Sequence, residues 1–192
     1  MSPAKPPINP LAISLSEASQ IRGNVSPEVK QTVASLAPRF AVTPDGKPGF
    51  ASSVGKRLKV TEVSLLPNKE ERERRECRVV VELAVEDDML NGVGTMHGGC
   101  SAFLIDNCST MPLAAYSLAT NGPGSLAAGV SQALNIVYHA PALLGDRLRI
   151  VSTTIAVGAR VMSARCEVWN DTRRRLVVSG VHVKMEPSAA KL

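Results

Sequence analysis

The sequence predicts an α+β fold in which one long helix packs against a curved antiparallel sheet. Two stretches with strand-like alternation precede an apolar helical stretch at residues 98–118, and four β-branched stretches follow it. The links between the later strands are as short as hairpin loops, so neighbouring strands should run antiparallel. With 192 residues, the chain can form one good core but is too short for two full domains.

The composition excludes several classes of function. The net charge is +5, but the basic residues are spread out, and their densest cluster, at residues 68–76, mixes both signs as a solvated loop does. Aromatic residues make up 3% of the chain, too few for the stacking surfaces of single-stranded nucleic-acid binders, so we expect no nucleic-acid partner. No apolar run approaches the roughly 20 residues of a membrane span. We expect a cytoplasmic protein, with a mitochondrial association left open.

The four cysteines, Cys77, Cys100, Cys108 and Cys166, show no CxxC spacing and lie in apolar patterns. This placement predicts reduced core residues and argues against a disulfide framework or a zinc site. We therefore expect neither a metal nor a cofactor.

The chain divides into four segments. Residues 1–25 are rich in Pro, Ser and Ala, and we expect them to be disordered or loosely attached. Residues 26–49 should form a short amphipathic helix at 26–40, capped by Ser26, and a turn-rich connector at 42–49. The α+β domain should span residues 50–186, followed by a C-terminal tail at 187–192.

Side-chain alternation predicts the strands of this domain. In the second strand, Val79, Val81 and Leu83 fall on one face, and Arg78 and Glu82 on the other. The predicted strands are residues 55–66, 77–87, 126–138, 146–157, 160–170 and 175–185.

A glycine-rich turn leads into the helix in the stretch "NGVGTMHGGCSAFLIDNCSTM", residues 91–111. Gly98 and Gly99 leave the first turn of the helix bare, with unpaired N–H groups and a partial positive charge. A substrate carbonyl oxygen could approach these amides closely, as in an oxyanion hole. The stretch also begins a dinucleotide-binding GxGxxG motif, but His97 replaces the third glycine and no βαβ unit surrounds it, so we reject that function.

Asp106 lies inside the predicted helix, among apolar and small residues. Burial would raise the pKa of this carboxyl group, as suits a general base working near neutral pH. Alternatively, Ser109, Thr110 or main-chain amides could satisfy the carboxylate, which would then be structural. The spacing leaves both interpretations open.

His97 and Asp106 cannot easily meet within one chain. Their nine-residue separation puts them about half a turn out of phase and ~13 Å apart along a helix. If both act in one site, a symmetric dimer should bring Asp106 of one chain to the His97–Gly98 end of the other. The spacing thus predicts an active site at a two-fold interface.

A second constellation follows the chain order of an α/β-hydrolase triad: Ser131, then Asp146 or Asp171, then His182. That motif requires a strand, a sharp turn and a helix, whereas the residues after Ser131 continue as a strand. We therefore reject the triad. His182 and His139 are interpreted as structural or exposed residues.

With these residues identified, the stretch 91–110 resembles the signature of hotdog-fold acyl-CoA thioesterases of the phenylacetyl-CoA thioesterase and thioesterase-superfamily-member-2 type. The signature is an Asn, a glycine-rich turn with His-Gly-Gly, and an Asp in the long helix. The similarity continues through residues 129–148 and covers roughly residues 50–186. It implies a hotdog fold, in which a curved antiparallel sheet wraps a central helix, and hydrolysis of an acyl-CoA to a free acid and CoA.

The resemblance also implies residue roles. Asp106 would be the general base or nucleophile, and the Gly98 amide would polarise the thioester carbonyl. Asn91 and His97 would position water or the carbonyl, and Ser131 would assist from the following strand. The family's site combines two subunits, and many members pair dimers into tetramers, so a homodimer and a homotetramer are expected.

Two other functions would suit the same fold. A hydratase or dehydratase would act on 2-enoyl or 3-hydroxyacyl thioesters, and a non-catalytic protein would bind acyl-CoA without turnover. The second would not need Asn, His, Gly and Asp together. Ala133 stands where several relatives carry Asp, and Pro112 is unexpected in the helix. These departures leave acyl-chain preference and CoA docking open.

Overall fold

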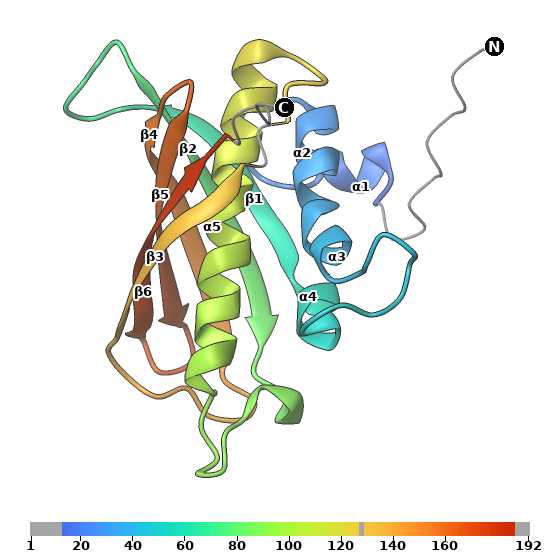
Figure 1. Ribbon diagram of the computed structural model, residues 1–192, viewed down its shortest axis with the longest axis vertical. Helices are drawn as coiled ribbons and strands as arrows, with labels where there is room; N and C mark the ends of the chain where they lie inside the picture. The colour runs from blue at the N-terminus through green and yellow to red at the C-terminus, as the bar shows by residue number, and fades with distance from the viewer. Residues whose placement is uncertain (1–12, 127–128, 187–192) are drawn as a thin grey trace, which may run out of the picture.

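A computed structural model describes residues 13–126 and 129–186 of the chain. One long helix, α5 (Gly98–Asn121), lies across one face of a curved six-stranded antiparallel sheet (Figure 1). The strands are β1 (Lys59–Pro67), β2 (Arg75–Ala84), β3 (Val130–Tyr138), β4 (Arg147–Val157), β5 (Val161–Asn170) and β6 (Arg175–Met185), in the spatial order β1-β2-β4-β5-β6-β3. The predicted fold class is confirmed.

The core forms where α5 packs on the sheet. Leu104, Ile105 and Met111 of α5 are fully buried, because the sheet surrounds much of the helix. Gly180 of β6 allows this close approach, since a Cβ there would lie 2.8 Å from Cγ2 of Ile105 and 2.9 Å from the main-chain oxygen of Asn135. Gly180 therefore lets the Ile105 side chain of α5 pack directly against the backbone of β6.

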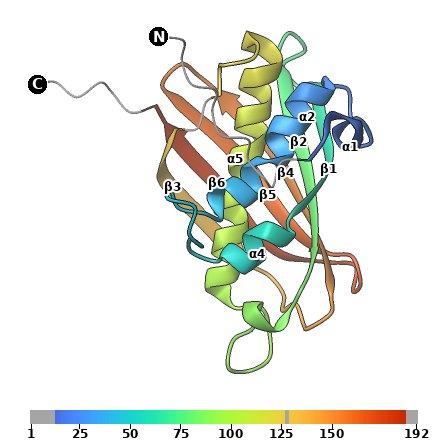
Figure 2. The same ribbon diagram turned by 90° about the vertical axis from the view of Figure 1, so that its right-hand side faces the viewer.

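From residue 13 onward, where the description begins, four short helices precede the sheet: α1 (Leu15–Ser19), α2 (Pro27–Ala34), α3 (Leu36–Phe40) and α4 (Ser52–Arg57). They flank α5 and β1, as the two ribbon views show (Figures 1 and 2). The Ser26 hydroxyl caps α2 by accepting from the Val29 amide, as predicted. A 3₁₀ turn, η1 (Asp87–Met89), leads from β2 into the glycine-rich turn before α5.

The segment 13–25 is attached to the domain, in contrast to the expectation for residues 1–25. Ser14 and Glu17 form a capping box that starts α1, and Ala18 is fully buried. These signals are short and follow a proline-rich stretch, so composition alone obscured them. Residues 1–12 and 187–192 lie outside the described residues.

The same segment covers the outer edge of β1. The amide of Arg22 donates to the main-chain oxygen of Thr61 at 3.1 Å, and the amide of Val63 donates to that of Arg22 at 2.9 Å. Further along, the side-chain amide of Asn24 exchanges two hydrogen bonds with the backbone of Leu65, at 2.7 and 2.9 Å. These contacts satisfy main-chain groups that an edge strand otherwise leaves open.

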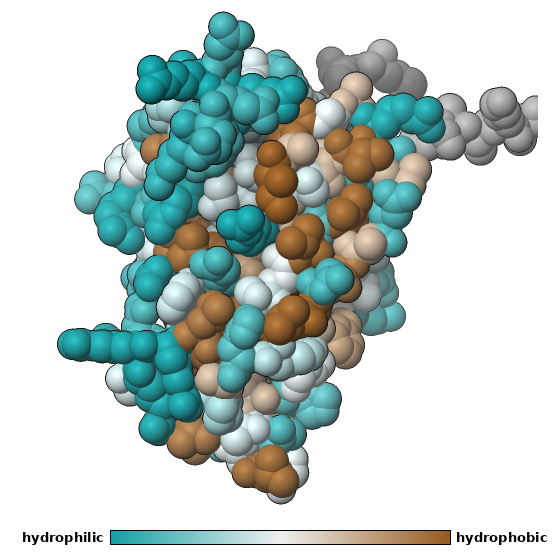
Figure 3. Space-filling view, turned by 90° about the vertical axis from the view of Figure 1, so that its left-hand side faces the viewer, coloured by the Kyte–Doolittle hydropathy of each residue, from teal (hydrophilic) through white to brown (hydrophobic). Residues whose placement is uncertain are grey.

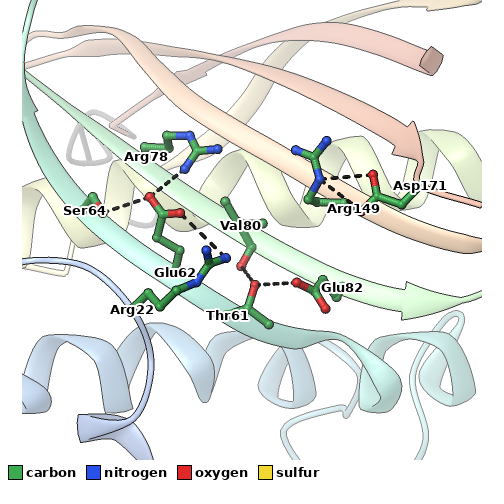
Figure 4. A network of polar contacts seen from close by, with 9 residues as sticks. All are labelled: Arg22, Thr61, Glu62, Ser64, Arg78, Val80, Glu82, Arg149 and Asp171. Carbon is green, nitrogen blue, oxygen red and sulfur yellow. Dashed lines mark hydrogen bonds and ion pairs between the residues drawn. The ribbon is translucent and has the colours of Figure 1, made fainter. Parts of the chain in front are cut away.

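Ion pairs lie on the sheet face opposite α5 (Figure 4). Glu62 of β1 pairs with Arg78 of β2 at 2.6 Å and with Arg22 at 4.0 Å, which ties the N-terminal segment to the sheet. Arg149 of β4 pairs with Asp171 at 3.1 Å. This half of the outer face is charged and suited to solvent.

The four cysteines are free thiols. Cys77, Cys108 and Cys166 are buried in the core as predicted, whereas Cys100 is half-buried. Burial raises the pKa of Cys77 and Cys166 to about 12 and that of Cys100 to about 11, so these three thiols stay protonated at neutral pH. In the part of the chain that the structure describes, no helix is long and apolar enough to span a membrane.

Candidate active site

Asp106 lies at a cavity of about 360 Å³ between α5, β3, β6 and the N-terminal helices. The cavity is lined by Phe40, Phe50, Phe103, Asp106, Asn107, Thr110, Gly129, Ser131 and Lys184. All three phenylalanines of the chain are in this set. The rings of Phe50 and Phe103 meet edge to face, with centroids 5.9 Å apart. An acidic group thus lies beside an aromatic wall.

The Asp106 carboxylate is more exposed than the sequence indicated. Its side chain is 47% exposed in the single chain, because β3 covers α5 only partly at this point. Thr110 donates to the main-chain oxygen of Asp106 at 2.9 Å, and the Ser109 hydroxyl lies 3.2 Å from the same oxygen; neither hydroxyl bonds the carboxylate. The local hydroxyls therefore leave the carboxylate oxygens available to other groups.

Ser131 and His182 are those groups. The Ser131 hydroxyl lies 3.4 Å from Oδ1 of Asp106 and 2.9 Å from Nε2 of His182, and that Nε2 lies 3.5 Å from the same Oδ1. On its other side, Nδ1 of His182 lies 2.7 Å from the Ser109 hydroxyl. These contacts can form one chain of hydrogen bonds that ends on the Asp106 carboxylate. In that chain, Ser109 donates to Nδ1 of His182, Nε2–H of His182 donates to the Ser131 hydroxyl, and Ser131 donates to the carboxylate.

The His182 ring is fully buried, and its pKa is lowered. Desolvation is the main cause, followed by the positive charge of Lys184, while Asp106 opposes both. A neutral imidazole is what the donor chain requires. Desolvation also lowers the pKa of Lys184, again against the attraction of Asp106.

His182 is the functional candidate that the sequence interpretation missed, since it was given a structural role. It reaches the site because β6 pairs with β3, with Leu134 opposite His182 and Ser131 opposite Lys184. The available signal in the sequence was that two polar residues, His182 and Lys184, alternate onto the buried face of the last strand. Lys184 is also a basic residue of the cavity, which composition could not single out.

The other predicted residues gather at the N-terminal end of α5. His97 caps the helix, with its Nδ1 accepting from the Gly99 amide at 2.8 Å. Among the described residues, the Gly98 amide has no hydrogen-bond acceptor. Asn91 holds the preceding turn: its Oδ1 accepts from the amides of Val93 and Thr95, at 3.0 and 3.1 Å.

The structure therefore separates the predicted residues into two groups. Asp106 and Ser131 meet at the Phe-lined cavity, whereas Gly98 borders a different hollow, of about 330 Å³, beside Tyr138 and His139. The two groups line different hollows, as the sequence spacing predicted for residues that cannot easily meet within one chain. Neither group alone combines a carboxylate with a free helix amide.

The rejected Ser–Asp–His triad does not form, although Ser131 and His182 are in contact. Nδ1 of His182 meets a serine hydroxyl in place of a carboxylate. Asp146 pairs with Arg173 at 3.0 Å, and Asp171 with Arg149. Across residues 13–126 and 129–186, no cluster of three or more His, Cys, Asp or Glu side chains could hold a metal ion.

Comparisons with known proteins identify the family and agree with the fold. Residues 93–177 match the family model described as the thioesterase superfamily. Human acyl-coenzyme A thioesterase 13 is 35% identical over 126 residues, which cover 66% of this chain and 79% of that protein; the mouse protein of that name is 33% identical over the same length. The crystal structure of zebra fish thioesterase superfamily member 2 superposes with a TM-score of 0.62 at 28% identity, covering 81% of this chain and 96% of that one.

Proposed function

We propose, because the chain belongs to the thioesterase superfamily, that it hydrolyses an acyl-CoA thioester to a free carboxylic acid and CoA. One observation carries the proposal: a half-exposed carboxylate and a bare helix amide lie on the same helix, α5. The first can activate a nucleophile, and the second can stabilise an oxyanion. Relatives named acyl-coenzyme A thioesterase support acyl-CoA as the substrate.

Asp106 drives the reaction in one of two balanced ways. As a general base, it takes a proton from water while the water oxygen bonds to the thioester carbon; the C–S bond then breaks, and the CoA thiolate takes up a proton. As a nucleophile, its carboxylate oxygen bonds to the thioester carbon as the C–S bond breaks, and the departing CoA thiolate takes up a proton; water then attacks the Asp106 carbonyl of the resulting anhydride and releases the free acid. In both, Ser131 and His182 orient the carboxylate. Single-turnover hydrolysis in oxygen-18 water separates them, because only the nucleophilic route labels Asp106.

The Gly98 amide polarises the thioester carbonyl. It lies at the positive end of the α5 dipole, where developing negative charge on the oxygen is stabilised. Since Gly98 and Asp106 of one chain are far apart, a second chain supplies the amide. His97 and Asn91 shape the turn that presents it.

The two unequal edges of the sheet support a homodimer. The β1 edge is covered by the N-terminal segment, whereas β3 is an open edge with exposed apolar side chains at Val130, Leu134 and Val137. Pairing of β3 strands about a two-fold axis buries these residues and continues the sheet. It also brings the α5 end of one chain toward Asp106 of the other.

The outer face of the sheet suits a further pairing of dimers into a homotetramer. Apolar side chains gather there in patches between polar ones (Figure 3). On β4, β5 and β6, the apolar side chains of Ile155, Val161 and Val181 are each exposed in the single chain. The ion-paired half over β1 and β2 remains outside this contact.

The Asp106→Asn variant tests the function. Because the amide keeps the shape but cannot accept a proton or attack, turnover should fall by about 10²–10⁴-fold. Free-thiol release is measured on acetyl- to palmitoyl-CoA and on phenylacetyl-CoA, with circular dichroism confirming the fold.

The matched control is Asp171→Asn, an exposed carboxylate on the β5–β6 hairpin, which should leave turnover unchanged. Full activity of Asp106→Asn would refute the assignment of the catalytic carboxylate. Absence of thiol release from the natural chain, with hydration of crotonyl-CoA, would favour a hydratase instead. Ligand binding without turnover would favour an acyl-CoA-binding protein.

A further inference from the structure

Tyr138, the last residue of β3, contacts the first turn of α5. Its hydroxyl donates to the main-chain oxygen of Gly98 at 3.1 Å. Its ring lies 3.6 Å from the place that a Cβ on Gly98 would occupy. Because the Tyr138 side chain is exposed in the single chain, packing within that chain does not account for its position against the helix.

One peptide group connects Tyr138 to His97. The carbonyl of Gly98 and the N–H of Gly99 belong to the same peptide plane. The carbonyl accepts from Tyr138, and the N–H donates to Nδ1 of His97 at 2.8 Å. A donor on the carbonyl polarises the peptide and strengthens donation by its N–H.

The acceptor role of Nδ1 determines the tautomer of His97. A neutral imidazole has one protonated and one unprotonated nitrogen, so an accepting Nδ1 places the proton on Nε2. The ring is then an N–H donor at the same end of α5 as the free amide of Gly98.

We propose that Tyr138 is a positioning residue that acts through the Gly98–Gly99 peptide to hold His97 in its Nε2–H tautomer. The consequence for turnover rests on the proposed function, in which this end of α5 binds the thioester. Tyr138 then keeps two N–H donors, those of His97 and Gly98, oriented toward one substrate group.

The glycine at position 99 fits this role. A Cβ there would lie 3.0 Å from Nδ1 and 3.2 Å from Cε1 of His97, so a side chain would push the ring off the amide. Gly99→Ala therefore disturbs the same connection from its other end, without altering Tyr138.

The test combines nitrogen-15 NMR of the histidine side chains with steady-state kinetics on the full chain. The chain has three histidines, and the signals of His97 are assigned from their loss in His97→Asn. In the natural protein, His97 should show a protonated Nε2 and an unprotonated Nδ1. In Tyr138→Phe, and in Gly99→Ala, the Nδ1–H form should grow. In Tyr138→Phe, kcat should fall about five-fold with a smaller change in KM, as expected for one lost hydrogen bond.

Tyr116→Phe is the matched control, because Tyr116 is the other tyrosine of the chain and lies further along α5. It should change neither readout. If Tyr138→Phe lowers the melting temperature but leaves the His97 signals and kcat unchanged, the role is merely structural and the proposal is wrong. A natural protein without thioesterase activity would refute the proposed function, while the His97 signals would still decide whether Tyr138 sets the tautomer.

Discussion

At the scale of single residues, His182 connects the core to the candidate site. Its ring is buried, and it lies between the hydroxyls of Ser109 and Ser131. The desolvation that keeps it neutral also lets it donate to Ser131, which in turn faces Asp106. A buried residue thus determines how a half-exposed carboxylate is hydrogen-bonded.

This burial predicts a stability that depends on pH. The folded-state pKa of His182 lies below its ordinary value of 6.5, so the unfolded chain binds a proton more readily in acid. The stability that neutral His182 contributes is fully present above pH 6.5 and is lost as the pH falls through the folded-state pKa. His182→Gln should flatten the decrease in melting temperature between about pH 7.5 and 5.

The exposed His139 provides the control, since His139→Gln should leave the slope of melting temperature against pH as it is. Glu62 and Asp146 contribute a separate loss of stability in acid. Their folded-state pKa values are lowered, so protonation of these carboxylates reduces stability only as the pH falls below their ordinary pKa values of 4.5 and 3.8. An equally steep decrease in His182→Gln would show that another group causes the loss.

Local sequence patterns predicted Asp106, Gly98 and His97 as candidate site residues, because all three lie in one helix and the turn before it. They also predicted the separation of the two groups, which follows from helical phase alone. His182 could not be predicted in the same way, since it lies 51 residues from Ser131 and meets it only through the β3–β6 register. The exposure of Asp106 likewise depends on how far β3 covers α5.

At the scale of elements, the N-terminal helices complete the cavity. Phe40 ends α3 and Phe50 precedes α4, and both lie outside the segment 93–177 that matches the family model. The alternation of residues predicted the sheet, but one helix expected at 26–40 divides at Ser35 into α2 and α3. That break places Phe40 at the cavity.

Phe50 should therefore influence which acyl groups are accepted. Its side chain is 81% exposed, so Phe50→Ala should change the free energy of unfolding by less than about 0.5 kcal/mol. Loss of an apolar contact with the acyl group should lower kcat/KM about ten-fold for the best substrate, and less for acetyl-CoA. The measurement is kcat/KM over the acyl-CoA panel.

Leu15→Ala removes an exposed apolar side chain from α1, away from the cavity, and should leave every kcat/KM unchanged. An identical profile in Phe50→Ala would place the acyl group elsewhere. Uniform loss across the panel, acetyl-CoA included, would indicate a damaged site and not a change in selectivity.

At the scale of the whole molecule, the two sheet edges differ in what they can bind. Leu134 lies on the open edge strand β3, directly opposite His182 of β6, and its side chain is exposed in the single chain. Leu134→Lys should prevent pairing of β3 strands and give a monomer. Because the proposed site needs two chains, thiol release should fall by at least about 10²-fold.

Light scattering coupled to gel filtration measures the assembly, with Ile155→Lys as the comparison. That variant alters the outer face, and it should reduce a tetramer to an active dimer. A fully active Leu134→Lys monomer would contradict a shared site. A tetramer that survives Ile155→Lys would contradict only the proposed contact between dimers.

The cover over the β1 edge has a consequence for growth of the assembly. A sheet with two free edges can add strands from further copies without limit, which is the route to fibres. Here Arg22 and Asn24 hydrogen-bond the main-chain groups of Thr61, Val63 and Leu65, so the β1 edge cannot pair with a strand of another copy. Growth through strand pairing then ends at two chains, because each copy has one edge to offer.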